Sequence, residues 1–177
     1  MKRPFTALTA LGTAAHHGYE LRAGVGIVFE PFLGRRRAIA MWSAIFAYWL
    51  AAARTGRDPR LTAHANGAAL GGALVHFVLW PWELRRGIPA LTEAEGLTAD
   101  QLPAYNAVLR CWIAAAALAL AFETPRDARA AAVTGMLMGE PLRRSARHHF
   151  RWAREQARRE PGRWSPALRL SAAGAGR

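Results

Sequence analysis

The sequence predicts an all-α fold: a small polytopic helical membrane protein with about four membrane-embedded helices and a basic amphipathic helix near the C-terminus. Three observations lead to this prediction. Four long runs are free or almost free of charge, the longest run ends in aromatic residues and a proline, and the arginines of a C-terminal stretch share one helical face. At 177 residues, 52% of them hydrophobic, the chain is long enough for one domain with a core.

The membrane-embedded helices are predicted from the uncharged runs. A spanning helix needs roughly 20 mainly apolar residues. Only the run at 61–82 reaches that length unaided, and Arg110 interrupts the last run, so the other runs depend on flanking side chains that extend to the interface. We therefore divide the chain into a helical membrane domain at 1–124 and a basic cytoplasmic tail at 125–177. The four runs are residues 5–19, 38–53, 61–82 and 102–122.

Two features of the longest run favour lipid as its surroundings. Gly67 and Gly71 form a GxxxG motif, in which small residues allow close approach of a partner helix within a bilayer. The run then ends in Trp80, Pro81 and Trp82 before charged residues, which is typical of an exit into the membrane interface. Buried helices of a soluble bundle also give alanine-rich apolar runs, and the mean hydropathy of −0.01 is near zero, so a soluble helical protein is an alternative.

A polar segment at 83–105 separates the third run from the fourth. Its composition predicts a solvated loop. Thr92 to Glu95 and Thr98 to Gln101 both have the spacing of a capping box. We therefore expect a short helix within the loop and the start of the fourth long helix at its end.

The distribution of basic residues predicts an orientation. If each run crosses the membrane once, one side receives 17 basic residues, including the 12 arginines of the tail, and the other side receives five. Because basic residues gather on the cytoplasmic side, this count favours a cell-membrane protein with both termini in the cytoplasm. Arg35, Arg36 and Arg37 disagree with this assignment, since they fall on the opposite side.

The tail contains an amphipathic helix at 141–160, followed by a segment beyond Trp164 whose composition predicts disorder. We predict that its arginine face binds the anionic headgroups of the lipid bilayer, each basic group contributing on the order of 1 kcal/mol. Nucleic acid is a less favoured partner, and a merely solvated helix is the remaining alternative. The apolar face comprises Leu142, Ala146, His149, Phe150, Ala153 and Ala157, and the lipid-binding face comprises Arg143, Arg144, Arg147, Arg151, Arg154 and Arg158.

The densest set of ionisable groups in an apolar segment is His16, His17 and Glu20. Burying ionisable groups within a membrane costs free energy, so the groups that are present there often have a functional role. On a helix the two histidines precede Glu20 by four and three residues, so the carboxylate can orient a histidine or raise its basicity. We predict these three residues as the catalytic group. In the alternative interpretation they form a self-satisfied polar cluster in which Arg22 neutralises Glu20.

The remaining histidines give weaker signals. His64 and His76 lie too far apart on one helix to share a metal ion, so a metal or haem site would need one of them to face the N-terminal histidine pair from another helix. No spacing demands this, and no metal or cofactor is predicted. His148 and His149 are predicted to be surface groups, and the single Cys111 excludes an internal disulfide.

Two classes of function follow for a membrane protein. The favoured one is a non-enzymatic accessory or transport-associated component that uses the GxxxG surface and the basic tail for contacts. The other is an enzyme that performs acid–base chemistry on a lipid or prenyl-type substrate, with carboxylates that converge on one cavity. A soluble helical protein with a nucleic-acid-binding tail is a further alternative. The enzyme hypothesis assigns proton transfer to Glu20, Glu30 or Glu83 and the pocket walls to Trp42, Trp49, Trp80 and Trp82.

Overall fold

The computed structural model describes residues 1–168 and is mostly helical, which confirms the all-α class. Most of the segment predicted to be disordered, 169–177, lies outside the described residues. That prediction is wrong for the segment just before it, because Trp164, Ser165 and Leu168 are buried. In chain order the elements are α1 (Pro4–Ala23), α2 (Glu30–Leu33), α3 (Arg35–Thr55), α4 (Pro59–Leu79), β1 (Trp82–Arg85), β2 (Ile88–Leu91), α5 (Leu102–Phe122), η1 (Arg126–Ala128), α6 (Arg129–Leu137) and α7 (Gly139–Arg159).

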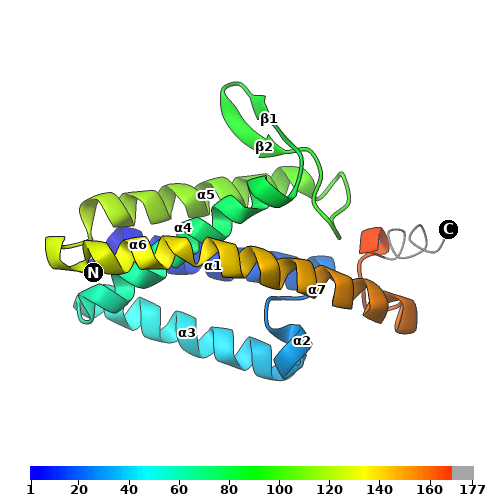
Figure 1. Cartoon of the computed structure of the whole chain (residues 1–177), viewed down its shortest axis with the longest axis horizontal. Coiled ribbons are helices and arrows are strands. Elements are labelled where there is room, and N and C mark those ends of the chain that lie inside the picture. Colours follow the sequence, from blue (N-terminus) through cyan, green and yellow to red (C-terminus); the bar gives the residue numbers. More distant parts are fainter. Residues whose placement is uncertain (169–177) are drawn as a thin grey trace.

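Four long helices, α1, α3, α4 and α5, form the body of the molecule (Figure 1). Each has 20 or 21 residues and is therefore about 30 Å long. A proline stands in the first turn of α1, α4 and α5, where its missing N–H leaves no hydrogen bond unmade. The first turn of α1 is fixed against the end of α5, because Phe5 and Thr6 donate backbone hydrogen bonds of 2.7 Å to the Glu123 carboxylate.

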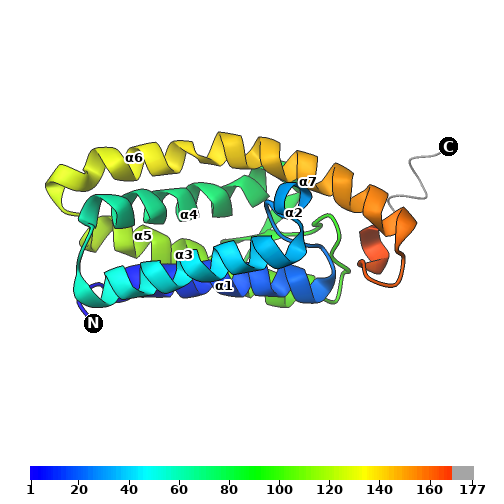
Figure 2. The ribbon, with the colours of Figure 1, turned by 90° about the horizontal axis from the view of Figure 1, so that it is seen from below.

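The closest helix contact joins α4 to the consecutive helices α6 and α7, which run parallel to it (Figure 2). Gly67 and Gly71 of α4 meet a second GxxxG pair, Gly135 and Gly139, which the sequence analysis missed. A Cβ atom on Gly67 would collide with the Ala132 carbonyl oxygen, and one on Gly135 would collide with the α4 backbone. The glycine pair predicted to serve a helix partner is therefore covered by a helix of the same chain.

The contact of α6 and α7 with α4 also determines the position of the tail. Because α6 and α7 return along α4, α7 ends beside α2 and the loop after the hairpin. Phe32 stacks on His148 with ring centroids 5.1 Å apart, Trp80 meets Phe150 at 5.5 Å, and Arg154 pairs with Glu95. The N-terminus and the end of α7 consequently lie at opposite ends of the bundle (Figure 1). The count of 17 against five assumed instead that the whole tail stays at the N-terminal end.

A β-hairpin replaces the first part of the predicted loop. β1 and β2 pair antiparallel, with Arg85 opposite Ile88, and the hairpin projects from the bundle (Figure 1). Its two turn residues, Arg86 and Gly87, have φ of 52° and 78°, as a tight two-residue turn between twisted strands requires. The alternation of apolar and polar residues in this segment is too short to predict a strand.

One helix among residues 1–168, α5, is long and apolar enough to cross a membrane by length and composition. The prediction of four spans is not supported by that criterion, because polar residues lower the mean hydropathy of the other long helices. Large apolar side chains nevertheless face outward on α1, α3, α4, α5 and α6. They include Leu8, Leu11, Ile45, Leu74, Val78, Leu118, Phe122, Val133 and Leu137.

We expect Gly67→Ala to lower the free energy of unfolding by about 1–3 kcal/mol, because the added methyl group forces α6 away from α4. Thermal unfolding of the purified protein, followed by circular dichroism, measures the change. Gly18→Ala is the matched control, since Gly18 lies in α1 with no atom within 4 Å of an added Cβ. Equal melting temperatures for Gly67→Ala and the unaltered protein would contradict the proposed role of the contact.

Candidate functional site

A cavity of about 440 Å³ lies between α1, α3, α4 and α7. Most of its wall is apolar and aromatic. Its polar groups come mainly from α1, with His64 and His76 from α4 and His149 from α7. Residues that represent the apolar wall are Trp42, Trp49, Val75, Trp112, Leu142 and Phe150, and the main ionisable residues are His16, His17, Glu20, His76 and His149.

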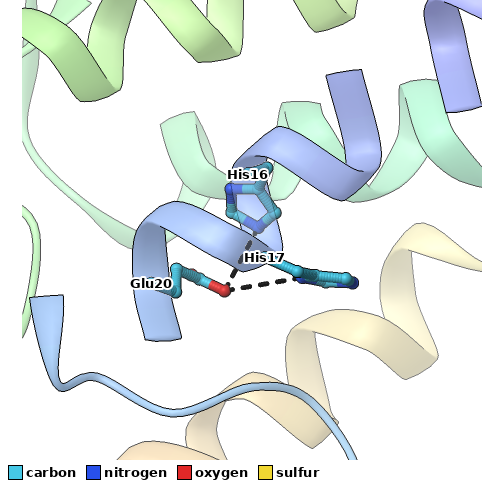
Figure 3. Close-up of side chains that lie close together, drawn as sticks. All are labelled: His16, His17 and Glu20. Carbon is cyan, nitrogen blue, oxygen red and sulfur yellow. Dashed lines mark ion pairs between the residues drawn. The ribbon is translucent and has the colours of Figure 1, made fainter. Parts of the chain in front are cut away.

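The ionisable centre of the cavity is His16, His17 and Glu20, which lie on one face of α1 (Figure 3). Glu20 Oε2 is 3.4 Å from His16 Nε2 and 3.6 Å from His17 Nδ1. All three residues are less than 10% exposed. The predicted proximity is therefore present, and Arg22, which the alternative interpretation paired with Glu20, is exposed instead.

The second carboxylate oxygen of Glu20 is held by a tyrosine. Tyr105 of α5 donates a hydrogen bond of 3.2 Å to Glu20 Oε1 and is itself 1% exposed. Its ring lies 5.5 Å from that of Tyr19, whose hydroxyl donates to the Gln101 carbonyl oxygen at 2.8 Å. The carboxylate is thus fixed from the α5 side, with Oε2 toward the imidazoles.

His76 of α4 faces His16 across the helix interface, with ring centroids 4.9 Å apart. Its Nδ1 lies 3.0 Å from the Gly72 carbonyl oxygen and 3.1 Å from that of Ala73. Nδ1 must carry the proton to make these bonds, so Nε2 of the neutral ring keeps its lone pair. Trp112 stacks on the other side of His16 at 4.8 Å. The two histidines therefore do meet from different helices, which sequence spacing alone did not demand.

His149 of α7 is buried, so the prediction of a surface group is wrong for this residue. Its Nε2 donates a hydrogen bond of 3.0 Å to the Val25 carbonyl oxygen, and burial lowers the pKa of the imidazole. The sequence held a signal, because His149 shares the apolar face of its helix with Phe150. His148, by contrast, is exposed as predicted.

The carboxylates do not converge as the enzyme hypothesis expected. Glu20 lines the cavity, whereas Glu83 is exposed on the hairpin and pairs with Arg85. Glu30 is buried beside the site but accepts a hydrogen bond of 2.8 Å from Arg163. One carboxylate is thus available to a molecule in the cavity. Of the tryptophans predicted to line the pocket, Trp42, Trp49 and Trp80 do so and Trp82 does not, while Trp112 adds a wall that was not predicted.

Several imidazole nitrogens in the cavity wall are buried without a hydrogen-bond partner among the described residues. They are His16 Nδ1, both nitrogens of His17 and His149 Nδ1. An unsatisfied buried polar group costs about 1–3 kcal/mol, so several together in one wall are unusual in a merely structural core. These nitrogens are therefore available to a molecule or ion in the cavity.

The predicted lipid-binding helix is observed at Gly139–Arg159 rather than 141–160, with its apolar and arginine faces as expected. His149, Phe150, Ala153 and Ala157 are buried against the bundle, so this face is not free to enter a lipid surface. The arginine face remains outward but is partly neutralised within the chain. Arg143 and Arg144 pair with Glu140, Arg154 pairs with Glu95, and Arg147 and Arg151 are exposed.

Comparison of the chain with protein-family models, curated proteins and solved structures finds no match in any of the three.

We expect His149→Ala to destabilise the fold by about 2 kcal/mol or more, because it removes a buried hydrogen bond and the packing of a buried ring. Arg147→Ala, an exposed residue of the same helix, should change stability by less than about 0.5 kcal/mol. Urea unfolding of both variants measures the difference. Equal losses of stability would show that the buried ring does not hold α7 against the loop after α1.

Proposed function

We propose that this protein is a membrane protein that binds an apolar molecule in its central cavity and exchanges protons with the polar end of that molecule. The observation that carries the proposal is a wall that is apolar except where buried histidines and one carboxylate meet. The cavity volume of about 440 Å³ lies within the range of about 300–1,000 Å³ that is typical of small-molecule sites. A lipid or prenyl-type molecule with one polar group has the required chemistry.

The residues have distinct roles in this proposal. Glu20 is the proton acceptor, and His16 and His17 lie beside it, with one imidazole nitrogen of each 3.4 and 3.6 Å from Glu20 Oε2. Tyr105 is a positioning residue that fixes the carboxylate from Oε1. The face of Trp42, whose ring lies 4.4 Å from that of His17, stabilises positive charge that develops on the substrate. The hypothesis of a non-enzymatic accessory component is weakened, because α6 covers the Gly67 and Gly71 surface that it assigned to a partner.

Membrane embedding is the second part of the proposal. The four long helices are each about 30 Å long, which matches the hydrocarbon thickness of a bilayer. Their outward apolar side chains and the paired GxxxG motifs, which allow parallel helices to approach without a large apolar interface, support lipid as the solvent.

We expect farnesol, a 15-carbon prenyl alcohol, to bind saturably and to change the fluorescence of the cavity tryptophans. Farnesene, its hydrocarbon counterpart, should bind about tenfold more weakly, because a hydrogen bond to a charged group contributes about 1.5 kcal/mol or more. Glu20→Gln should reduce this preference for the alcohol while leaving farnesene binding unchanged.

The matched variants for this experiment are Ala146→Phe and Ala114→Phe. Ala146 lines the cavity and its enlargement should weaken both ligands at least tenfold, whereas Ala114 is exposed on α5 and should leave binding unchanged. Non-saturable uptake of farnesol, equal in all variants, would identify simple partition into detergent and contradict the proposal.

The orientation follows from where the arginines gather. Arg35 to Arg37, Arg85, Arg86 and the C-terminal half of α7 share one end of the bundle, so we propose that this end faces the cytoplasm and the anionic headgroups of the cell membrane. The N-terminus then faces the opposite side. This assignment removes the conflict that Arg35 to Arg37 created when both termini were assigned to the cytoplasm.

We expect Lys2→Cys and Glu160→Cys, each in a Cys111→Ala background, to react with an impermeant maleimide from opposite sides. Both positions are exposed. In sealed inside-out vesicles the cysteine at position 160 should label and that at position 2 should not, and right-side-out vesicles should reverse the pattern. Labelling of both cysteines from one side would restore the cytoplasmic location of both termini.

A further inference from the structure

We propose that His16, His17 and Glu20 bind a divalent transition-metal ion of the zinc and iron class, with open coordination positions toward the cavity. The inference deepens the proposed function, because it names a cofactor for the same cavity. Two imidazoles and one carboxylate are the ligand set of many catalytic zinc and non-haem iron sites. A bound metal supplies Lewis acidity and an activated water, which would take over the proton exchange otherwise assigned to the side chains.

The distances already resemble a coordination sphere. One donor atom from each residue lies within 4.8 Å of the other two. Metal–ligand bonds of about 2.1 Å in tetrahedral geometry place neighbouring donor atoms roughly 3.4 Å apart. Glu20 Oε2 lies 3.4 Å from His16 Nε2 and 3.6 Å from His17 Nδ1, so two edges of such a site are present.

The same distances argue against a self-satisfied ion pair. A charge-assisted hydrogen bond between imidazolium and carboxylate is about 2.7–2.9 Å long, whereas the two contacts here are 3.4 and 3.6 Å. The imidazoles are near enough to share an ion with the carboxylate and too far from it to bond well directly. Both nitrogens of His17 are buried without a hydrogen-bond partner among the described residues.

The charge of Glu20 and the groups that hold it agree with this assignment. Among residues 1–168, Glu20 is buried beside imidazoles rather than beside Arg or Lys, and a buried carboxylate needs a compensating positive charge. Tyr105 holds Glu20 Oε1, which leaves Oε2 for the ion, in the manner of an outer-shell group that orients a ligand. His76 adds a further imidazole beside His16, with Nδ1–H donating to backbone carbonyls and the lone pair of Nε2 available to an ion.

The test is a titration of the full-length, chelator-treated protein in detergent with Co²⁺ and, separately, with Zn²⁺. We expect one ion per chain by elemental analysis after dialysis, with visible absorption bands of the bound Co²⁺. His17→Ala and Glu20→Gln should weaken binding at least 100-fold, and Tyr105→Phe should weaken it about 10- to 100-fold. His148→Ala, an exposed histidine, should bind as the unaltered protein does.

Folding of every variant is checked by its melting temperature before titration. Failure of the folded, unaltered protein to bind either ion overturns the inference whatever the variants do, as does equal binding by a folded Glu20→Gln variant. Saturable farnesol binding without metal binding overturns the metal site alone. Metal binding without farnesol binding overturns the apolar-ligand function and leaves the metal site standing.

Discussion

The close approach of α4 to α6 and α7 determines much of the rest of the structure. Two pairs of glycines, 67 with 71 and 135 with 139, let the backbones approach closely, and a Cβ atom on Gly67, Gly71 or Gly135 would collide with the backbone of the facing helix. Because the helices then run in parallel, α7 is carried back along the bundle to the end where α1 and α4 finish. That return brings His149 and Phe150 into the wall of the cavity.

A cavity formed in this way contains polar groups that are expensive in apolar surroundings. Glu20, His16 and His17 are each less than 10% exposed, and Tyr105, which orients the carboxylate, is 1% exposed. A fold that required only a packed core would be more stable with apolar residues of similar volume at these positions. Their presence is therefore best explained by a ligand or ion that completes their interactions, and the apolar wall sets what kind of molecule can accompany it.

The parts of the fold that were predictable from the sequence depend on local chemistry. The long helices follow from uncharged runs that begin at prolines, the i,i+4 spacing of His16 and Glu20 fixes their proximity, and the arginine and apolar faces of α7 follow from helical periodicity. What was missed depends on contacts between distant segments. The sequence does not indicate that Gly135 and Gly139 face Gly67 and Gly71. The course of the tail, the burial of His149 and the arrangement of the two chain ends follow from that contact, so they could not be predicted. The hairpin turn needs φ > 0 at Arg86, a residue that gives no such signal.

The position of the site along the bundle explains how a buried centre can still exchange protons or take up an ion. Glu20 lies three residues before the end of α1, about 5 Å along the helix axis, and His76 lies equally close to the end of α4. Both helices finish at the end of the bundle where the arginines gather. The polar centre therefore sits within about one helical turn of that end, while Trp49 and the alanines of α4 extend the apolar wall toward the other end. An amphiphilic molecule that enters with its apolar part directed toward the N-terminal end would leave its polar group beside Glu20.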